Sequence, residues 1–276
     1  MARRDDRQTL VVPAQTREGK ISVVIHTYNS EKFLSRVLSS VKNFDEVLIC
    51  DMHSTDRTQE IAQKYNCRII YHEKSELPEP ARNFAIQSAS NEWVLVVDSD
   101  EIIPEALQHY LYGRIKGETD LQGIWLTRKN YTFGHFLHGE YPDHILRFFR
   151  KENAWWPPYV HTLPAVKGRV EYVPKHKKEL AIIHLANDSM TEKLRKINLY
   201  SSDEVLKRAG KRFPVWKIFT APFFRFFISY ILKGGFRDGK VGIVIAGMDA
   251  FYKFVSIAKI WESSARNEDM DKELLG

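Results

Sequence analysis

The sequence predicts an α/β fold in which a mostly parallel, doubly wound sheet is followed by a helical C-terminal extension. Four short apolar runs alternate with helical patterns in the N-terminal part, and polar residues follow the runs. The C-terminal third is basic and aromatic instead. Strands that alternate with helices are typical of parallel sheets. Hydrophobic residues make up 43% of the 276 residues, which is enough to bury a full core.

The expected elements follow from hydrophobic periodicity and turn residues. The strands of the sheet are predicted at Ile21–Ile25, Glu46–Cys50, Arg68–Tyr71 and Glu92–Val97. The helices between and after them are predicted around Phe33–Val41, from Thr55 or Asp56 through Ala62, at Glu79–Ala89 and at Ile102–Leu111. Further on, strands are predicted at Gly123–Arg128 and Leu146–Arg150, and a helix at Met190–Arg208. Ligands of such sheets bind at the carboxyl ends of the strands, where this chain carries its polar clusters.

The two cysteines exclude a disulfide framework as the organising device of the fold. Cys50 closes an apolar run and is expected to be a buried core thiol, and a reducing compartment fits this composition. The N-terminus is polar and has no apolar segment of a secretory signal. We expect a flexible arm at 1–19, a catalytic domain at 20–200 and a basic, amphipathic helical region at 201–276.

An acidic pair follows the fourth predicted strand. Val94–Val97 is followed by Asp98 and Asp100, which are separated by one residue. Residues i and i+2 at a strand end point the same way, and two like charges that close repel unless a cation or donors neutralise them. Carboxylate oxygens suit a hard divalent cation that also holds substrate phosphates. The pair predicts a metal site for a diphosphate, and the alternative is a solvated turn with Asp100 as a helix cap.

Four motifs between Lys20 and Pro104 resemble a known family in residues, order and spacing. They are ISVVIHTYN at 21–29, Asp51 with STDRT at 54–58, ARN at 81–83 and DSD at 98–100. Together they resemble inverting glycosyltransferase family 2. The resemblance implies the GT-A fold, a hexosyltransferase activity, a nucleotide-diphospho-sugar donor that is expected to be a UDP-sugar, and Mg²⁺ or Mn²⁺ as the cofactor.

The resemblance also implies roles for individual residues. The residues placed around the donor nucleotide are Thr27, Tyr28, Asn29, Asp51, Arg82 and Asp98. Asp51 matches the acid that binds the base, usually uracil. Asp100 would bind the metal, and Asp98 would bind the ribose or the metal. The alternatives are core packing for Tyr28, a helix-entry cap for Asp51 and a surface salt bridge for Arg82.

The second half resembles the lipopolysaccharide-core glucosyltransferase subgroup of this family. The residues that carry this resemblance are Tyr141-Pro142-Asp143, Arg147-Phe148-Phe149, Val160-His161, His184 and the tail motif Gly235–Gly242. The subgroup usually has Glu after the His of Val-His, whereas this chain has Thr162, which leaves the acceptor open. The resemblance implies transfer to a saccharide or lipid-linked acceptor in cell-envelope polysaccharide or lipopolysaccharide biosynthesis.

Inversion requires a base that reaches the acceptor hydroxyl. Asp143, in a loop before a strand, is the first candidate, and Glu140 is the reserve. The alternative for Asp143 is a cap or an ion pair with Arg147. We place His161 with Asp98 and Asp100 in the predicted metal shell.

Several other side chains have two interpretations each. His161 and His184 are candidates to complete the metal shell or to donate to the diphosphate, or else are structural histidines. Arg147 and Arg150 are candidates to hold phosphates, and a surface role is an equal alternative for Arg150. Trp155-Trp156 either stacks on a sugar or packs in the core, and core packing is the favoured interpretation.

The positive charge is concentrated late in the chain. Between Val205 and Lys240 there are nine Lys or Arg and one acid, Asp238, and the net charge of the chain is +6. The apolar stretches Phe213–Leu232 and Val241–Trp261 are interrupted by charges, so no spanning helix is expected. Such helices lie on an anionic membrane surface, here the cytoplasmic face of the inner membrane, or pack on the catalytic domain or a second subunit.

Other functional classes are less compatible with the sequence. The first predicted strand is followed by neither a Gly-x-Gly-x-x-Gly motif nor a P-loop, which argues against dinucleotide oxidoreductases and P-loop enzymes. A nucleotidyltransferase would carry a Gly-rich, Arg-containing loop there. Two alternatives stay open: a non-catalytic sugar-nucleotide-binding homologue, and a basic module that binds nucleic acid or membrane. We expect no nucleic-acid partner.

Overall fold

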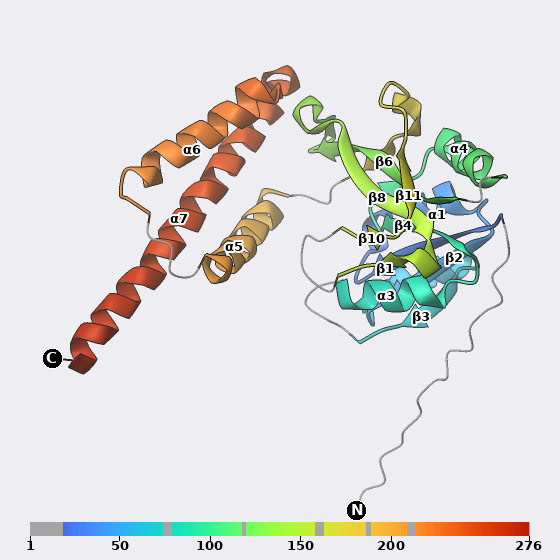
Figure 1. Ribbon diagram of the computed structural model, residues 1–276, viewed down its shortest axis with the longest axis horizontal. Coiled ribbons are helices and arrows are strands. Elements are labelled where there is room, and N and C mark those ends of the chain that lie inside the picture. The colour runs from blue at the N-terminus through green and yellow to red at the C-terminus, as the bar shows by residue number, and fades with distance from the viewer. Residues whose placement is uncertain are drawn as a thin grey trace, which may run out of the picture. The chain divides into compact units, whose positions relative to one another are not determined.

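The computed structural model describes residues 19–73, 79–117, 120–157, 163–185, 189–208 and 213–275 (Figure 1). Contacts divide the chain into two compact units. Unit 1 comprises Met1–Arg128 and Pro142–His184, and unit 2 comprises Lys129–Tyr141 and Leu185–Gly276. The fold class is confirmed, because unit 1 has an α/β architecture and unit 2 is mainly helical.

Unit 1 is built on a mixed sheet with the strand order β3-β2-β1-β4-β8-β6-β12-β5, and β11 pairs with β6. The parallel part contains β1 (Ile21–Thr27), β2 (Glu46–Asp51), β3 (Arg68–Tyr71) and β4 (Trp93–Asp98). The remaining strands of this sheet are β5 (Glu101–Ile102), β6 (Leu121–Thr132), β8 (Asp143–Arg150), β11 (Arg169–Tyr172) and β12 (Ile182–His184). A separate small ribbon is formed by β9 (Ala154–Trp155) and β10 (Ala165–Val166).

Helices cover both faces of the parallel strands. They are α1 (Glu31–Val41), α2 (Thr58–Lys64), α3 (Glu79–Ser88) and α4 (Glu105–Ile115). Successive residues of a strand point to opposite faces, so Val23 and Ile25 of β1 belong to the core under α1 and α4, whereas Val24 belongs to the core under α3. This arrangement is the predicted doubly wound sheet. Cys50 is fully buried as expected, and burial raises the pKa of its thiol to about 12.

The segment after the acidic pair differs from the prediction. The helix expected at Ile102–Leu111 begins only at Glu105, after Pro104. Glu101 and Ile102 instead form β5, which pairs with β12. Pro104 has an extended backbone, and the residue before a proline, here Ile103, is disfavoured in the helical conformation, so the helix begins after Pro104. Asp100 is therefore not the cap of this helix.

Unit 2 contains the end of β6, the short strand β7 that pairs with it, and the C-terminal helices. Its elements are β7 (His135–Phe136), η1 (His138–Glu140), α5 (Met190–Lys207), α6 (Lys217–Phe227), the π-helical turn η4 (Ile228–Leu232), η5 (Gly235–Asp238) and α7 (Gly239–Leu275). Both α5 and α6 pack on α7. The predicted helix at Met190–Arg208 is confirmed within one residue of its end.

Within the described part of the chain, one helical stretch, Gly235–Ala265, is long and apolar enough to cross a membrane, by length and composition alone. No spanning helix was expected because charged residues interrupt this stretch, and it is nevertheless apolar enough on average to span. Only 22% of its most apolar window is buried in the protein. The C-terminal region therefore contains one apolar helix that is able to associate with a membrane.

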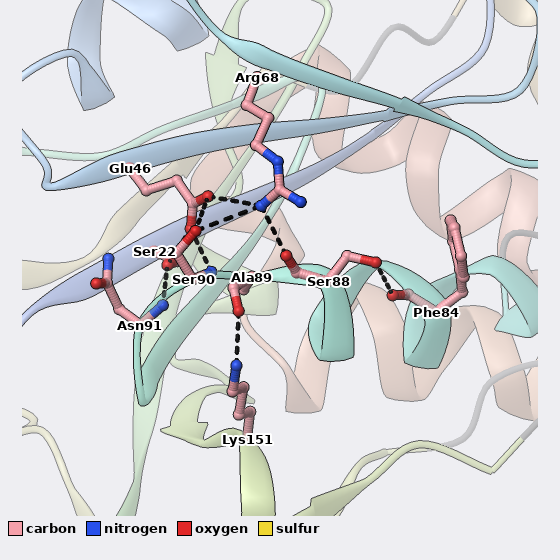
Figure 2. A network of polar contacts seen from close by, with 9 residues as sticks. All are labelled: Ser22, Glu46, Arg68, Phe84, Ser88, Ala89, Ser90, Asn91 and Lys151. Atoms are coloured by element: carbon pink, nitrogen blue, oxygen red, sulfur yellow. Dashed lines mark hydrogen bonds and ion pairs between the residues drawn. The ribbon is translucent and has the colours of Figure 1, made fainter. Parts of the chain in front are cut away.

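A buried polar network surrounds Glu46 at the amino end of β2 (Figure 2). The Glu46 carboxylate accepts hydrogen bonds from Ser22 Oγ at 2.5 Å, from the backbone and side chain of Ser90 at 2.7 Å each, and from Arg68 Nη1 at 3.0 Å. Burial by itself opposes ionisation, but these donors outweigh it and hold the pKa of Glu46 below its ordinary value. The network ties β1, β2 and β3 to the turn before β4.

We expect Glu46→Gln to destabilise unit 1 by about 1–3 kcal/mol, since the amide cannot accept all four donors of the buried carboxylate. The pKa of Glu46 is lowered on folding, so its contribution is complete above the pKa of the unfolded chain and is lost as the pH falls through the folded value. Urea unfolding at pH 7 and at pH 3.5 tests this. A stability difference that does not shrink at the lower pH would contradict the role given to the charge.

Candidate active site

Three predicted site residues lie at one edge of the sheet, because the parallel strands that carry them end together. In the register of the sheet, Thr27 of β1 is paired with Asp51 of β2, and His26 of β1 is paired with Asp98 of β4. The carboxyl ends of β1, β2 and β4 therefore bring the three predicted motifs together. This is the edge at which ligands of open α/β sheets bind.

Asp51 is completely buried and organises the turn after β2. Its carboxylate accepts hydrogen bonds from Thr27 Oγ1 (2.8 Å), from Ser54 N and Oγ (2.9 and 2.6 Å) and from Gln59 Nε2 (2.9 Å). A carboxylate has about four acceptor positions, and the chain uses four. A direct contact between Asp51 and a base stays a prediction, and in this arrangement it requires one of these donors to move.

Asn29 joins this turn to the end of β1. Its backbone N–H donates to Ser54 Oγ at 2.9 Å, and its side-chain oxygen accepts from the backbone of Thr55 at 2.8 Å. The backbone of Asn29 has a φ of +48°, a conformation that asparagine tolerates better than most residues. The neighbouring Tyr28 is 37% exposed, so it is not a core residue. These contacts form a small polar shelf beside an exposed ring.

Asp98 is paired with two arginines at the end of β4. Arg147 of β8 binds it through both terminal nitrogens, at 3.2 and 2.7 Å, and Arg82 of α3 lies 3.7 Å away. Burial by itself raises the pKa of Asp98, but Arg147 and Arg82 more than reverse this and hold it well below its ordinary value. Asp98 is therefore a stable carboxylate, and a metal ion would compete with Arg147 for it.

Trp156 forms a platform beneath these arginines. The Arg82 guanidinium carbon lies 4.3 Å from the centre of its ring, and that of Arg147 lies 5.2 Å away. Asn83 fixes the Trp156 backbone from both sides, since its amide donates to Trp156 O at 2.7 Å and its oxygen accepts from Trp156 N at 2.9 Å. Trp156 is 3% exposed, which confirms the favoured core-packing interpretation for this residue, whereas Trp155 is 55% exposed and is not a core residue. The third residue of the ARN motif thus positions the second.

His26 packs beside the same arginines as a neutral imidazole. Burial first, and then the positive charge of Arg82, lower its pKa to about 3. Its Nε2 lies 3.4 Å from the carbonyl oxygen of Ala81. His26 is therefore uncharged at neutral pH and adds no positive charge to that of Arg82 and Arg147.

Asp100 and His184 form the pair that best fits a metal. Pairing of β5 with β12 places His184 opposite Glu101, and His184 Nε2 lies 3.4 Å from Asp100 Oδ2. Burial disfavours protonation of His184, but its hydrogen bond with Asp100 outweighs this and raises its pKa. Both side chains are partly exposed, at 24% and 22%. A carboxylate oxygen and an imidazole nitrogen suit Mn²⁺, and a carboxylate alone suits Mg²⁺.

The described residues contain no group of three or more His, Cys, Asp and Glu that is arranged to hold a metal. A two-ligand site nevertheless fits a cation that keeps water and substrate phosphates in its remaining positions. His161, the predicted third ligand, lies outside the described residues.

The sequence did not single out Glu101 and Arg128, which connect the acidic pair to the candidate base. Glu101 is fully buried and accepts from Arg128 Nη1 at 2.9 Å and from the backbone of Asp98 at 3.0 Å. Arg128 also binds Asp143 Oδ2, at 2.9 Å from Nε and 2.8 Å from Nη2. In the sequence, the position of Glu101 directly after Asp98-Ser99-Asp100 was the signal that could have included it in the site.

Two predictions for charged residues are wrong: the alternative ion pair of Asp143 with Arg147, and the candidate phosphate-binding role of Arg150. Asp143 is paired with Arg128 and not with Arg147, because β6 and β8 place Arg128 directly opposite Asp143. Arg150 is not near the predicted phosphate site. It lies opposite Trp93 at the amino end of β4 and is paired with Glu92. The reserve base Glu140 is exposed in η1, within unit 2.

The family model for glycosyl transferase family 2 matches residues 22–168, which is more than half of the chain. Among similar proteins, the lipopolysaccharide core biosynthesis glycosyltransferase LpsC of Rhizobium meliloti is 26% identical over 89% of this chain and 93% of its own length. An uncharacterised glycosyltransferase of Rickettsia typhi is 27% identical over 91% of this chain and 90% of its own length.

A solved structure shows the same fold. The mannosyltransferase PcManGT of Pyrobaculum calidifontis, solved in complex with GDP-Man and Mn²⁺, has a TM-score of 0.53 and 14% sequence identity. The match covers 91% of this chain and 89% of that one. The mixed sheet, the polar strand ends and the family match agree, and the chain is a glycosyltransferase with the GT-A fold that belongs to glycosyl transferase family 2.

Proposed function

We propose that this chain is an inverting hexosyltransferase that uses a nucleotide-diphospho-sugar, expected to be a UDP-sugar, in cell-envelope or lipopolysaccharide biosynthesis. The acceptor is a saccharide or a lipid-linked saccharide. Similarity to LpsC over nearly the full length of both chains supports the acceptor class. The observation that carries the proposal is the Asp100–His184 pair, which lies beyond the same strand end as Asp98 and its two arginines.

The roles of the donor-site residues follow from their chemistry. Asp100 and His184 would hold Mg²⁺ or Mn²⁺, with Asp98 and His161 as the further predicted ligands. When bound, the metal neutralises charge on the departing diphosphate. Arg82 and Arg147 add fixed positive charge beside it, and Trp156 keeps both from rotating away. The nucleotide is expected at the carboxyl ends of β1 and β2, in contact with Thr27, Tyr28, Asn29 and Asp51.

Asp143 is the proposed base. In the reaction its carboxylate takes the proton of the acceptor hydroxyl while that oxygen forms a bond to the anomeric carbon. The bond from this carbon to the diphosphate oxygen breaks on the opposite face, and the electron pair leaves with the nucleoside diphosphate. Arg128 grips Asp143 through two nitrogens, which fixes the direction of the carboxylate before the acceptor binds.

We expect UDP together with Mn²⁺ to raise the melting temperature of the protein, because a ligand that binds only the folded state stabilises it. Asp100→Ala should abolish the part of this shift that depends on the metal. Differential scanning fluorimetry with UDP, GDP and their hexose conjugates, each with Mn²⁺, Mg²⁺ or EDTA, measures it. Asp120→Ala, which removes an exposed carboxylate paired with Arg169, is the matched control. An undiminished metal-dependent shift in melting temperature in Asp100→Ala would contradict the metal-binding role of Asp100.

We further propose that unit 2 binds the anionic cytoplasmic face of the inner membrane as a peripheral element. The exposed side chains of α6 include Phe219 (73%), Phe223 (65%) and Phe224 (58%). Lys217 and Arg225 lie on the same helix. Aromatic side chains interleaved with basic ones match an interface of acyl chains and acidic headgroups.

Flotation with vesicles that contain 30 mol% phosphatidylglycerol is the test. We expect the wild-type chain to float, and Phe219→Ser/Phe223→Ser to reduce the bound fraction at least about tenfold, since each buried CH₂ contributes ~0.8 kcal/mol to such binding. Phe133→Ser, at an exposed aromatic residue outside α6, is the comparison variant. Equal flotation of the α6 double variant, or binding to a DNA oligonucleotide in place of vesicles, would contradict the proposal.

A further inference from the structure

The tail motif Gly235–Gly242 is built around a buried carboxylate whose partners come from a distant loop of unit 2. The Asp238 side chain is only 3% exposed. Asp238 accepts hydrogen bonds from the backbone N–H of His138 at 2.9 Å and from that of Gly139 at 3.4 Å. It also lies 2.6 Å from Nδ1 of the His138 ring. One aspartate therefore holds both the backbone and the ring of a residue one hundred positions earlier in the chain.

Glycines allow this close approach. A Cβ on Gly139 would lie 3.0 Å from the carbonyl oxygen of Lys233, and one on Gly235 would lie 2.8 Å from that of Ser229. Neither position has space for a side chain unless the backbone moves. The motif therefore fixes the loop at His138. This gives a structural role to the glycines and the aspartate of the tail motif, none of which belongs to the donor site.

The contact with Asp238 determines which ring nitrogen of His138 is available. A carboxylate can only accept, so Nδ1 carries a proton and points at Asp238, and Nε2 is the ring nitrogen left to contact a ligand. The His138 side chain is 41% exposed, and none of the described residues hydrogen-bonds to Nε2. The ring is also held by Phe136, whose edge-on contact has a centroid separation of 4.8 Å. An oriented, accessible imidazole nitrogen is the result.

The hairpin that leads to His138 carries an exposed aromatic residue in an unfavourable conformation. Thr132 of β6 pairs with His135 of β7, so Phe133 and Gly134 form a two-residue turn. Their φ values are +51° and +77°, which such turns require and which asparagine and glycine adopt most readily. Phe133 adopts it although the residue remains 40% exposed. A strained backbone at an exposed residue such as Phe133 indicates a candidate functional site.

We propose that Phe133 and His138, two residues of the hairpin 130–141, bind the saccharide acceptor of the reaction, an inference that rests on the proposed transferase function. Phe133 offers a flat apolar face for the C–H side of a sugar ring. His138 Nε2 forms a hydrogen bond with one of its hydroxyls, and Asp238 is the positioning residue for that imidazole. In sequence, the hairpin connects Arg128 to Asp143, which is the candidate base and is paired with Arg128.

The test measures acceptor and donor binding separately. The acceptor probe is the oligosaccharide released by deacylation from the lipopolysaccharide of a strain that lacks this chain, and its affinity is measured by saturation-transfer NMR titration. The donor readout is the shift in melting temperature with UDP and Mn²⁺. The variants are His138→Ala and Phe133→Asn, and His135→Ala is the matched control because it removes an exposed histidine of the same hairpin that has no aspartate partner among the described residues.

We expect His138→Ala and Phe133→Asn each to weaken oligosaccharide binding at least about tenfold, while the UDP shift stays unchanged and His135→Ala stays within twofold of wild type. Phe133→Asn should also raise the melting temperature, because asparagine relieves the turn. A purely structural role predicts the opposite sign.

Wild-type protein that binds no oligosaccharide, or variants that bind it normally, would overturn the inference. So would variants that lose only vesicle binding, because the hairpin would then be a membrane contact. A chain that ignores UDP but loses oligosaccharide binding in His138→Ala would refute the donor assignment and leave the acceptor site standing.

Discussion

Asp143→Asn is expected to lower the rate of sugar transfer by about 10²- to 10⁴-fold, the usual contribution of a general base. The amide keeps the size of the side chain, and its oxygen still accepts from Arg128, so the fold and the donor shift with UDP and Mn²⁺ should be preserved. The measurement is the initial rate of transfer from a radiolabelled sugar nucleotide to the deacylated oligosaccharide. The loss should appear in kcat more than in the KM for the donor.

Glu140→Gln serves as the comparison, because Glu140 is the reserve base and lies three residues away in η1. We expect a change of only a few-fold. Loss of transfer in Glu140→Gln with normal rates in Asp143→Asn would exchange the two roles. Normal rates in both variants would remove the base from this segment altogether.

Arg147→Met is expected to reduce the stability of unit 1 by about 3 kcal/mol, since removal of one partner leaves a largely buried carboxylate without its bidentate cation. Of the two arginines paired with Asp98 among the described residues, Arg82, at 3.7 Å, would then remain. Thermal and urea unfolding measure the change. Combining it with Asp98→Asn should recover most of the loss, because the uncompensated charge is then gone. A double variant no more stable than Arg147→Met would show that packing on Trp156, not the charge pair, is what the arginine supplies.

The pH dependence of this variant has a definite sign. Folding lowers the pKa of Asp98, so its stabilising effect is complete above the unfolded pKa, near 4, and is lost only as the pH falls through the much lower folded value. The difference in the free energy of unfolding between wild type and Arg147→Met should therefore be constant from pH 7 to 5 and become smaller below pH 4.

The parallel part of the fold was predictable because its elements are local patterns. The strand at Arg68–Tyr71 has the predicted bounds, and the other three parallel strands differ by one or two residues at an end. The exception is Glu101–Ile102, which reads as the start of a helix. Its strand state depends on pairing with Ile183 and His184, about eighty positions later in the chain, and no local pattern reports that.

The predicted site residues gather where the strand pattern placed them, but their partners were not readable from sequence. Asp98 meets Arg147 across 49 positions, and Thr27 meets Asp51 across 24. Which arginine pairs with which acid depends on the register of β6 and β8. That register determines that Arg128, and not Arg147, pairs with Asp143. Residue types were therefore predictable, whereas pairing was a property of the sheet.

The central claim is that a divalent cation binds at Asp100 and His184 and holds the diphosphate of the donor. The most direct measurement is a crystal structure of the protein grown with UDP and Mn²⁺, with data collected at the manganese absorption edge. We predict one strong anomalous peak in direct contact with an Asp100 carboxylate oxygen, His184 Nε2 and the diphosphate. Ordered UDP with no anomalous peak at this pair, or with manganese bound elsewhere, would contradict it.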